Sequence, residues 1–133
     1  MSDLIVDTHA ASWYFAKSPE LSGVARNAIN HSVNLGNVIY LPTISLVEIV
    51  YLLDKNKLPQ ATLPRLVRAL NDPSSSFVPI DLTPGIALAV QQIPRSTVPD
   101  MPDRIIAATA LHLGLPLITA DHKIQAANIQ TIW

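Results

Sequence analysis

Short apolar runs alternate along the chain with longer segments whose apolar positions recur every three or four residues. The short runs predict buried strands, at residues 4–6, 38–41, 77–80, 116–119 and 129–133. Strands that are apolar throughout and separated by helices favour a parallel sheet covered on both faces. The pattern therefore predicts an α/β fold with three layers, α/β/α, around a central parallel sheet of four to five strands. No repeat or linker interrupts it, so residues 1–133 are expected to form one domain.

The periodic segments predict the helices between these strands. Ser18-Pro19 and Thr83-Pro84 each resemble a helix start with a capping hydroxyl followed by proline, and Gly114 is suited to end a helix. Residues 94–102 are rich in proline and predict a loop. The expected helices cover residues 9–16, Ser18 to about Gly36, the segment after 42–45 through Leu53, Leu63 to Leu70, the segment from Pro84, and 104–113.

Composition narrows the chemistry that such a domain can carry. Hydrophobic residues make up 49% of the chain and charged residues 14%, which is enough apolar material for a sizeable core. Cysteine is absent, so any metal must be held by oxygen or imidazole ligands. A net charge of −1 argues against nucleic-acid binding through a broad cationic surface, but not against an enzyme whose metal ions supply positive charge locally. No long apolar run or basic leader stands out, which predicts neither membrane insertion nor export.

Half of the ten acidic residues stand where a parallel sheet would gather them. Ligands in such folds bind beyond the carboxyl ends of the strands. Two acids directly follow predicted strands, two stand at the start of the helix before the fourth strand, and one lies in the apolar helix after the second strand. These residues are Asp7, Asp121, Asp100, Asp103 and Glu48.

Glu48 is the most informative of the five because it lies within the run ISLVEIVYL. A buried carboxylate is costly unless it is paired or binds a cation, and crowded carboxylates repel one another. A hard divalent ion such as Mg²⁺ or Mn²⁺ would relieve both costs, because it prefers oxygen ligands. Such ions activate water and polarise phosphodiesters, so the pattern favours phosphoryl hydrolysis.

Each acid also has a simpler interpretation. Asp7 would cap the following helix, and Asp100 with Asp103 has the spacing of a capping arrangement. Glu48 would be a partly exposed helix residue, and Asp121 would belong to a turn. Only the conjunction of all of them favours a metal site.

Four segments resemble the PIN-domain ribonucleases, in particular the VapC-type toxins of type II toxin–antitoxin systems. In the family's order they are IVDTHAASWYF, TISLVEIVYLLDKNKL, DMPDRIIAATAL and LPLITADHKI. With their connections they cover nearly the whole chain, and DxxDRIIAATAL followed by LITAD is the most specific part. The resemblance implies a PIN-like fold and a Mg²⁺- or Mn²⁺-dependent endoribonuclease.

The resemblance also implies roles for individual residues. Asp7, Glu48, Asp103 and Asp121 match the family's catalytic and metal-binding acids, one of which would also act as general base, and Asp100 matches a frequent additional metal ligand. Thr119, with Thr8, supplies a hydroxyl beside them. The implied setting is cytoplasmic, with an RNA substrate, a homodimer and a cognate antitoxin that covers the active site.

Several further residues have two interpretations. Candidate contacts to RNA or antitoxin are Arg104, Trp13, Lys55 and Lys57. Each has an equally simple explanation: Arg104 would pair with carboxylates on its helix, Trp13 would belong to the core, and the two lysines would lie on a solvated helix face. His9 and His122 stand next to proposed ligands and are expected beside the metal shell or at the surface rather than in it. The alternative to a nuclease is a non-catalytic PIN-like module that holds RNA or a protein without cutting.

Overall fold

A five-stranded parallel sheet forms the centre of the chain in the computed structural model, which describes residues 3–133. The strand order is β3-β2-β1-β4-β5, and every pairing is parallel. The strands are β1 (Leu4–Val6), β2 (Ile39–Pro42), β3 (Phe77–Ile80), β4 (Leu117–Ile118) and β5 (Thr131–Ile132). The predicted α/β class and parallel sheet are confirmed. The predicted domain also includes residues 1 and 2, which lie outside the described residues.

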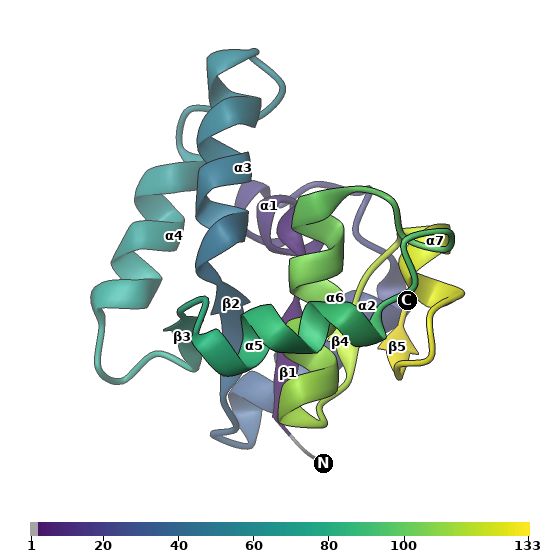
Figure 1. The fold of residues 1–133 in the computed structure, drawn as a ribbon. Helices are drawn as coiled ribbons and strands as arrows, with labels where there is room; N and C mark the ends of the chain where they lie inside the picture. The colour runs from purple at the N-terminus through teal and green to yellow at the C-terminus, as the bar shows by residue number, and fades with distance from the viewer. Residues whose placement is uncertain (1–2) are drawn as a thin grey trace.

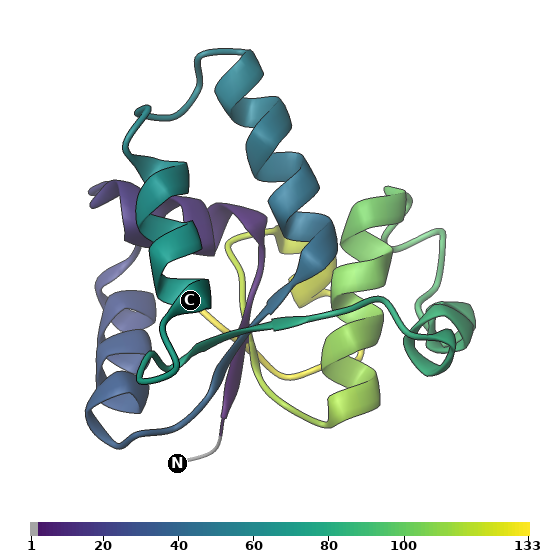
Figure 2. The ribbon, with the colours of Figure 1, turned by 90° about the vertical axis from the view of Figure 1, so that its left-hand side faces the viewer.

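The helices cover both faces of this sheet. Figure 2 shows α1, α2 and α4 on one side and α5 and α6 on the other, while α3 rises beyond the end of β2. The helices are α1 (Thr8–Ala16), α2 (Gly23–Asn34), α3 (Thr43–Asp54), α4 (Thr62–Asn71), α5 (Pro84–Ala89), α6 (Met101–Leu113) and α7 (His122–Gln125), and a 3-10 turn, η1 (Val90–Gln92), follows α5 (Figure 1).

Two apolar clusters form the core, one on each face of the sheet. Leu4 and Val6 of β1 pack into the cluster under α1 and α2, while Ile5 between them packs into the cluster under α5 and α6. This alternation follows from the pleat of a strand, which points successive side chains to opposite faces. Because both faces are covered, β1 is apolar at every position and fully buried.

Three helix boundaries differ from the sequence prediction. Helix α2 begins at Gly23 with Ser22 as its cap, not at Ser18-Pro19, whose residues form a turn. Helix α6 begins at Met101, within the segment predicted as loop, because Asp100 caps it and Pro102 is tolerated in a first helical turn. The short helix α7 was not predicted and begins at the cap Asp121. The predicted cap Thr83 with Pro84 is confirmed.

The chain order brings the ends of β1 and β4 together at the middle of the sheet, since these strands pair directly. The residues after β1 lead into α1, and those after β4 lead into α7. Helices α3 and α6 contact each other beside this edge. The acids on these four helices therefore come within reach of one pocket. Within residues 3–133, no helix has both the length and the apolar character needed to cross a bilayer.

Candidate active site

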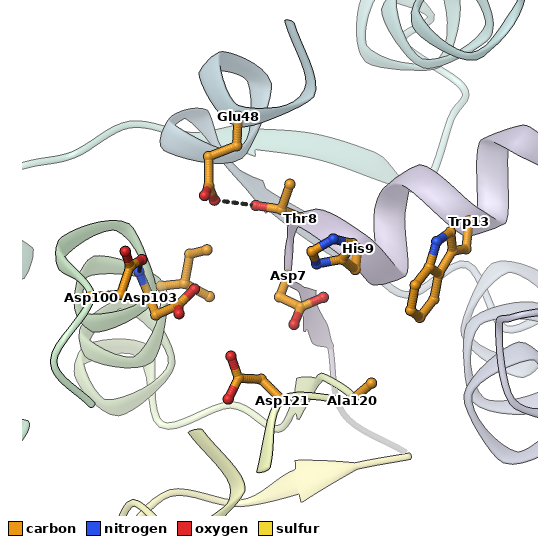
Figure 3. A pocket seen from close by; sticks show the side chains of 10 residues that line it. Asp7, Thr8, His9, Trp13, Glu48, Asp100, Asp103, Ala120 and Asp121 are labelled. Carbon is orange, nitrogen blue, oxygen red and sulfur yellow. Dashed lines mark hydrogen bonds between the residues drawn. The ribbon is translucent and has the colours of Figure 1, made fainter. Parts of the chain in front are cut away.

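A pocket of about 420 Å³ opens at the carboxyl ends of β1 and β4. All five acids singled out in the sequence line it (Figure 3). Its lining residues are Asp7, Thr8, His9, Trp13, Glu48, Asp100, Asp103, Ile106, Ala120 and Asp121. Carboxylates that are up to 114 residues apart in sequence, from Asp7 to Asp121, thus share one space.

Asp7 is the most buried of these acids, with 6% of its surface exposed. Its Oδ1 accepts a hydrogen bond from the backbone N–H of Ala10 at 2.8 Å, which caps α1. Burial raises the pKa of Asp7, and the hydrogen bonds from Thr119 and Ala10 only partly offset that rise. The Asp121 carboxylate raises the pKa further. Asp7 is therefore both a helix cap and a poorly solvated carboxyl group in the pocket.

Glu48 is anchored to the start of α1. The hydroxyl of Thr8 donates to Glu48 Oε1 at 2.5 Å and also lies 3.0 Å from Oγ of the buried Ser45 (Figure 3). Because Thr8 has a single hydroxyl proton, the Ser45 hydroxyl is the donor to Thr8 in this chain of contacts. Helix α3 thus presents Glu48 to the pocket in an orientation set by α1.

Asp100 and Asp103 stand at the start of α6. Oδ2 of Asp100 accepts from the Asp103 N–H at 3.3 Å and caps the helix. The pKa of Asp103 is raised to about 7, mainly by burial and further by the nearby carboxylates. These are, in order of effect, Asp100, Asp121, Glu48 and Asp7. Asp103 therefore experiences the charge of every other acid in the pocket.

Asp121 caps the short helix α7. Its Oδ1 accepts from the N–H groups of Lys123 and Ile124, at 2.8 and 3.2 Å. The buried hydroxyl of Thr119 accepts from the Asp121 N–H at 3.0 Å and hydrogen-bonds the carboxyl of Asp7. Thr119 therefore links the loop after β4 to the acid after β1. The capping and pocket interpretations are not exclusive, because Asp7, Asp100 and Asp121 all cap a helix while lining the pocket.

The chemistry of this lining fits a hard divalent cation. Apart from the imidazole of His9, its metal-ligating groups are oxygen atoms, and the raised pKa of Asp103 reflects burial first and crowded negative charge second. Within residues 3–133, no three acidic or histidine side chains stand close enough together to form a ready-made metal site. Mg²⁺ usually keeps several of its waters and binds directly to only one or two carboxylates. A pocket of spaced carboxylates is therefore compatible with it.

The other candidate residues divide between the pocket and the surface. Trp13 and His9 line the pocket, and their ring centroids are 5.3 Å apart. Arg104 instead donates to the carbonyl oxygens of Val90 and Ile93, so the ion pair considered for it on α6 is not what the structure shows. Its proposed contact with RNA or antitoxin remains a prediction.

The remaining predicted contacts lie at helix ends. Lys55 and Lys57 are exposed at and after the end of α3, and His122 is exposed on α7. The sequence interpretation missed Ser45. Its position one helical turn before Glu48 places the two residues on one face of α3, and that spacing was the available signal.

The fold and the pocket define a class of protein. The family model described as "PIN domain" matches residues 4–129, and the chain belongs to this family. The PIN-like fold implied by the sequence motifs is confirmed.

The chain also resembles individual members and solved structures. It is 29% identical over 126 residues to Ribonuclease VapC22 of Mycobacterium tuberculosis, covering 95% of this chain and 92% of that protein. It superposes on VapBC2 from Rickettsia felis, bound to a promoter DNA fragment, with a TM-score of 0.72 and 16% identity, covering 97% of this chain and 96% of the other. A toxin–antitoxin complex from Klebsiella pneumoniae gives a TM-score of 0.64 at 23% identity, covering 98% and 96%. These structural matches establish the fold.

Proposed function

We propose that this protein is a metal-dependent endoribonuclease, the toxin of a toxin–antitoxin pair, acting in the cytoplasm. The observation that carries the proposal is the convergence of Asp7, Glu48, Asp103 and Asp121 on one pocket of a PIN-domain chain. A relative named a ribonuclease is 29% identical to this chain over 126 residues, which supports the proposal.

Asp7, Glu48, Asp103 and Asp121 would hold Mg²⁺ or Mn²⁺, directly or through water, with Asp100 at the exposed margin. A bound ion of this kind lowers the pKa of an attacking water and offsets charge on the phosphodiester. The protein contributes the placement of the carboxylates. Thr8 fixes one oxygen of Glu48, and Thr119 joins the backbone of Asp121 to the carboxyl of Asp7.

A partner protein and a second copy of the chain belong to the same proposal. The structural neighbour from Klebsiella pneumoniae is a toxin–antitoxin complex, and the neighbour from Rickettsia felis is VapBC2 bound to a promoter DNA fragment. We infer a cognate antitoxin here, which would silence the nuclease by covering the acidic pocket. We also infer a homodimer, because α3 exposes a stripe of apolar side chains formed by Val47, Val50 and Tyr51.

The test is cleavage of end-labelled single-stranded RNA by the purified protein with Mg²⁺ or Mn²⁺, compared with the same reaction in a chelator. Asp7→Asn and Asp103→Asn should each abolish cleavage while the far-ultraviolet circular dichroism stays unchanged. Asp81→Asn is the matched control, since Asp81 is exposed in the loop after β3. It should cleave like the wild type.

The outcomes separate the nuclease from the alternative of a non-catalytic module. RNA bound without products, in the presence of either metal, supports the module and contradicts the nuclease. Full cleavage by Asp103→Asn would refute the assignment of this acid. Expression in cells, alone and with the adjoining reading frame, tests the toxin role, because a cognate antitoxin should relieve growth arrest.

A further inference from the structure

Trp13 lines a second hollow besides the acidic pocket. This second hollow, here called the lysine groove, has a volume of about 290 Å³ and lies between the end of α1 and the turn after α3. Its lining includes Trp13, Lys17, Pro19, Lys57, Leu58 and Pro59. Because Trp13 belongs to both linings, the groove adjoins the acidic pocket.

The indole of Trp13 is held between two other rings. Its centroid lies 5.3 Å from that of His9 and 5.8 Å from that of Trp133, and the side chain is half-buried. Figure 3 shows His9 between Asp7 and Trp13, so the indole stands just beyond the acids. An aromatic ring fixed in this way is a platform on which a nucleic-acid base can stack.

Two lysines give the groove a charge opposite to that of the pocket. Lys17 and Lys57 are both exposed and both line it, and Glu20 is the acid among its lining residues. Lys17 has a left-handed backbone, φ 56°, at the end of α1, a position that usually favours glycine. Lys57 follows Asn56, which has the same φ at the end of α3. Two tight helix ends therefore direct ammonium groups to one hollow.

We propose that Trp13, Lys17 and Lys57 form a subsite for the nucleotide next to the scissile phosphodiester of single-stranded RNA. The base stacks on Trp13, and the following phosphate is neutralised by the two lysines. A single strand is required because its bases are free to leave the stack and lie on an indole. The inference rests on the proposed nuclease function, since it places the scissile phosphate in the acidic pocket.

The groove suits a nucleotide better than a helical peptide. A bound amphipathic helix needs a long apolar groove with anchor sites at helical spacing. This hollow is small, has a single large aromatic ring and carries a cation on each rim. A phosphate between the lysines and a base on the indole would satisfy all three features.

The chain offers a direct probe, since Trp13 and Trp133 are its two tryptophans. Trp133→Phe leaves Trp13 as the sole indole, and adding Asp103→Asn prevents cleavage under the proposed function. In the presence of Mg²⁺, a single-stranded RNA octamer of mixed sequence should quench the Trp13 fluorescence saturably. The same octamer in a duplex should not. No quenching, or equal quenching by the duplex, would overturn the proposal.

Point variants test the lysines against general electrostatic attraction. In the nuclease assay Lys57→Ala and Lys17→Ala should raise KM severalfold with kcat nearly unchanged. Arg95→Ala is the control, because Arg95 is an exposed cation in the loop before α6 and does not line the groove. Trp13→Ala should weaken RNA binding at least about fivefold, the lower end of what loss of base stacking costs. Thermal melting of each variant checks its fold.

The two proposals fail in different ways. If the wild type cuts no RNA but Trp13 is still quenched, the nuclease function fails, and only the stacking of RNA on Trp13 stands. If RNA is cut and the Trp13, Lys17 and Lys57 variants keep the wild-type KM, the subsite fails alone. Equal effects of Arg95→Ala and Lys57→Ala on KM would also overturn the subsite. Unchanged RNA affinity combined with lost binding of a purified antitoxin would assign the groove to the protein partner instead.

Discussion

The hydroxyl of Thr8 joins the two helices that carry Asp7 and Glu48. It is buried at the first position of α1 and bonds Glu48, while the Ser45 hydroxyl beneath it completes the chain. A buried hydroxyl that loses its partner pays its full desolvation cost. Thr8 therefore affects both the stability of the α1–α3 contact and the orientation of a proposed metal ligand.

Thr8→Val should separate these effects from side-chain size, since valine has nearly the same shape without the hydroxyl. We expect a loss of about 1–3 kcal/mol in the free energy of unfolding, because the Ser45 hydroxyl loses its partner. We also expect about a tenfold or greater loss in metal affinity, as when groups that orient metal ligands are removed. Denaturant titration measures the free energy of unfolding, and the dependence of cleavage on metal concentration measures the metal affinity. Thr8→Ser keeps the hydroxyl and should behave like the wild type. Equal behaviour of Thr8→Val and Thr8→Ser would contradict the proposed role of the Thr8 hydroxyl in orienting Glu48.

The raised pKa values of Asp7 and Asp103 predict how stability changes with pH. Unfolding returns each group toward its ordinary value of 3.8, so the folded protein binds more protons than the unfolded chain above that value. Their contribution is fully present below about pH 4 and is lost as the pH rises through about 7, the pKa of Asp103. In the absence of a dication, the free energy of unfolding should fall over this range.

Urea titrations across the same pH range would measure this slope. Asp103→Asn removes the group whose pKa is raised to about 7 and should flatten the slope while raising stability near neutral pH. Mg²⁺ should stabilise the wild type more at about pH 8 than at about pH 5, because ionised carboxylates bind it. A wild-type slope retained in Asp103→Asn would exclude Asp103 as its source.

The candidate site could be predicted at residue level where strand ends determine it. Asp7 and Asp121 follow apolar strands, and the rule for parallel sheets places such residues at one edge. Ser45 was missed, because its position one helical turn before Glu48 shows a shared helix face but not that the Thr8 hydroxyl lies beside both residues. The direction of the Arg104 side chain could not be predicted either. It donates to the carbonyl oxygens of Val90 and Ile93, which only the packing of η1 against α6 brings within reach.

At the scale of elements, the start of α2 shows why the existence of a helix was easier to predict than the residue at which it begins. Two serines four residues apart both have the chemistry of a cap, and Pro19 made Ser18 the stronger candidate. The structure uses Ser22, whose hydroxyl accepts from the Ala25 N–H at 3.0 Å. Ser18 accepts from Glu20 in an exposed turn, which lets Leu21 enter the core before the helix begins.

The two serines provide a matched pair for measuring the cap. Ser22→Ala should lower the free energy of unfolding by about 1 kcal/mol, the usual cost of removing a helix cap. Ser18→Ala should cost less, because its hydrogen bond lies in an exposed turn where water can replace it. Chemical denaturation of both variants gives the comparison. A larger loss for Ser18→Ala would show that the turn, not the cap, determines where α2 starts.

At the scale of the molecule, the pattern of apolar residues predicts the layers of helices and strands. It does not predict the order of the strands or which face of a helix packs on the core. The edge strand β3 carries Pro79, which lacks a backbone donor and is suited to an edge. Strand order depends on helix crossovers that periodicity does not encode. Eight of the twelve residues of α3 are apolar and lie on more than one face, so the sequence could not show that Val47, Val50 and Tyr51 face outward.

That outward stripe predicts a dimer. Val47, Val50 and Tyr51 lie at positions i, i+3 and i+4 of α3, with 51%, 42% and 63% of their surfaces exposed. Residues at this spacing share one helix face, and an apolar face of this kind on a helix that projects from the fold is a candidate for contact with a second copy (Figure 1).

Sedimentation equilibrium should therefore find a dimer that Tyr51→Glu converts to monomer, because the partner's stripe would face a buried charge. Leu88→Glu is the control, since Leu88 on α5 is 66% exposed but lies outside the stripe. It should leave the dimer intact. A monomeric wild type, or a dimer that survives Tyr51→Glu and dissociates with Leu88→Glu, would move the interface away from α3. Glu48 lies on the same helix as the stripe. RNA cleavage by the Tyr51→Glu variant should therefore also be measured, because it shows whether dimer formation supports the pocket.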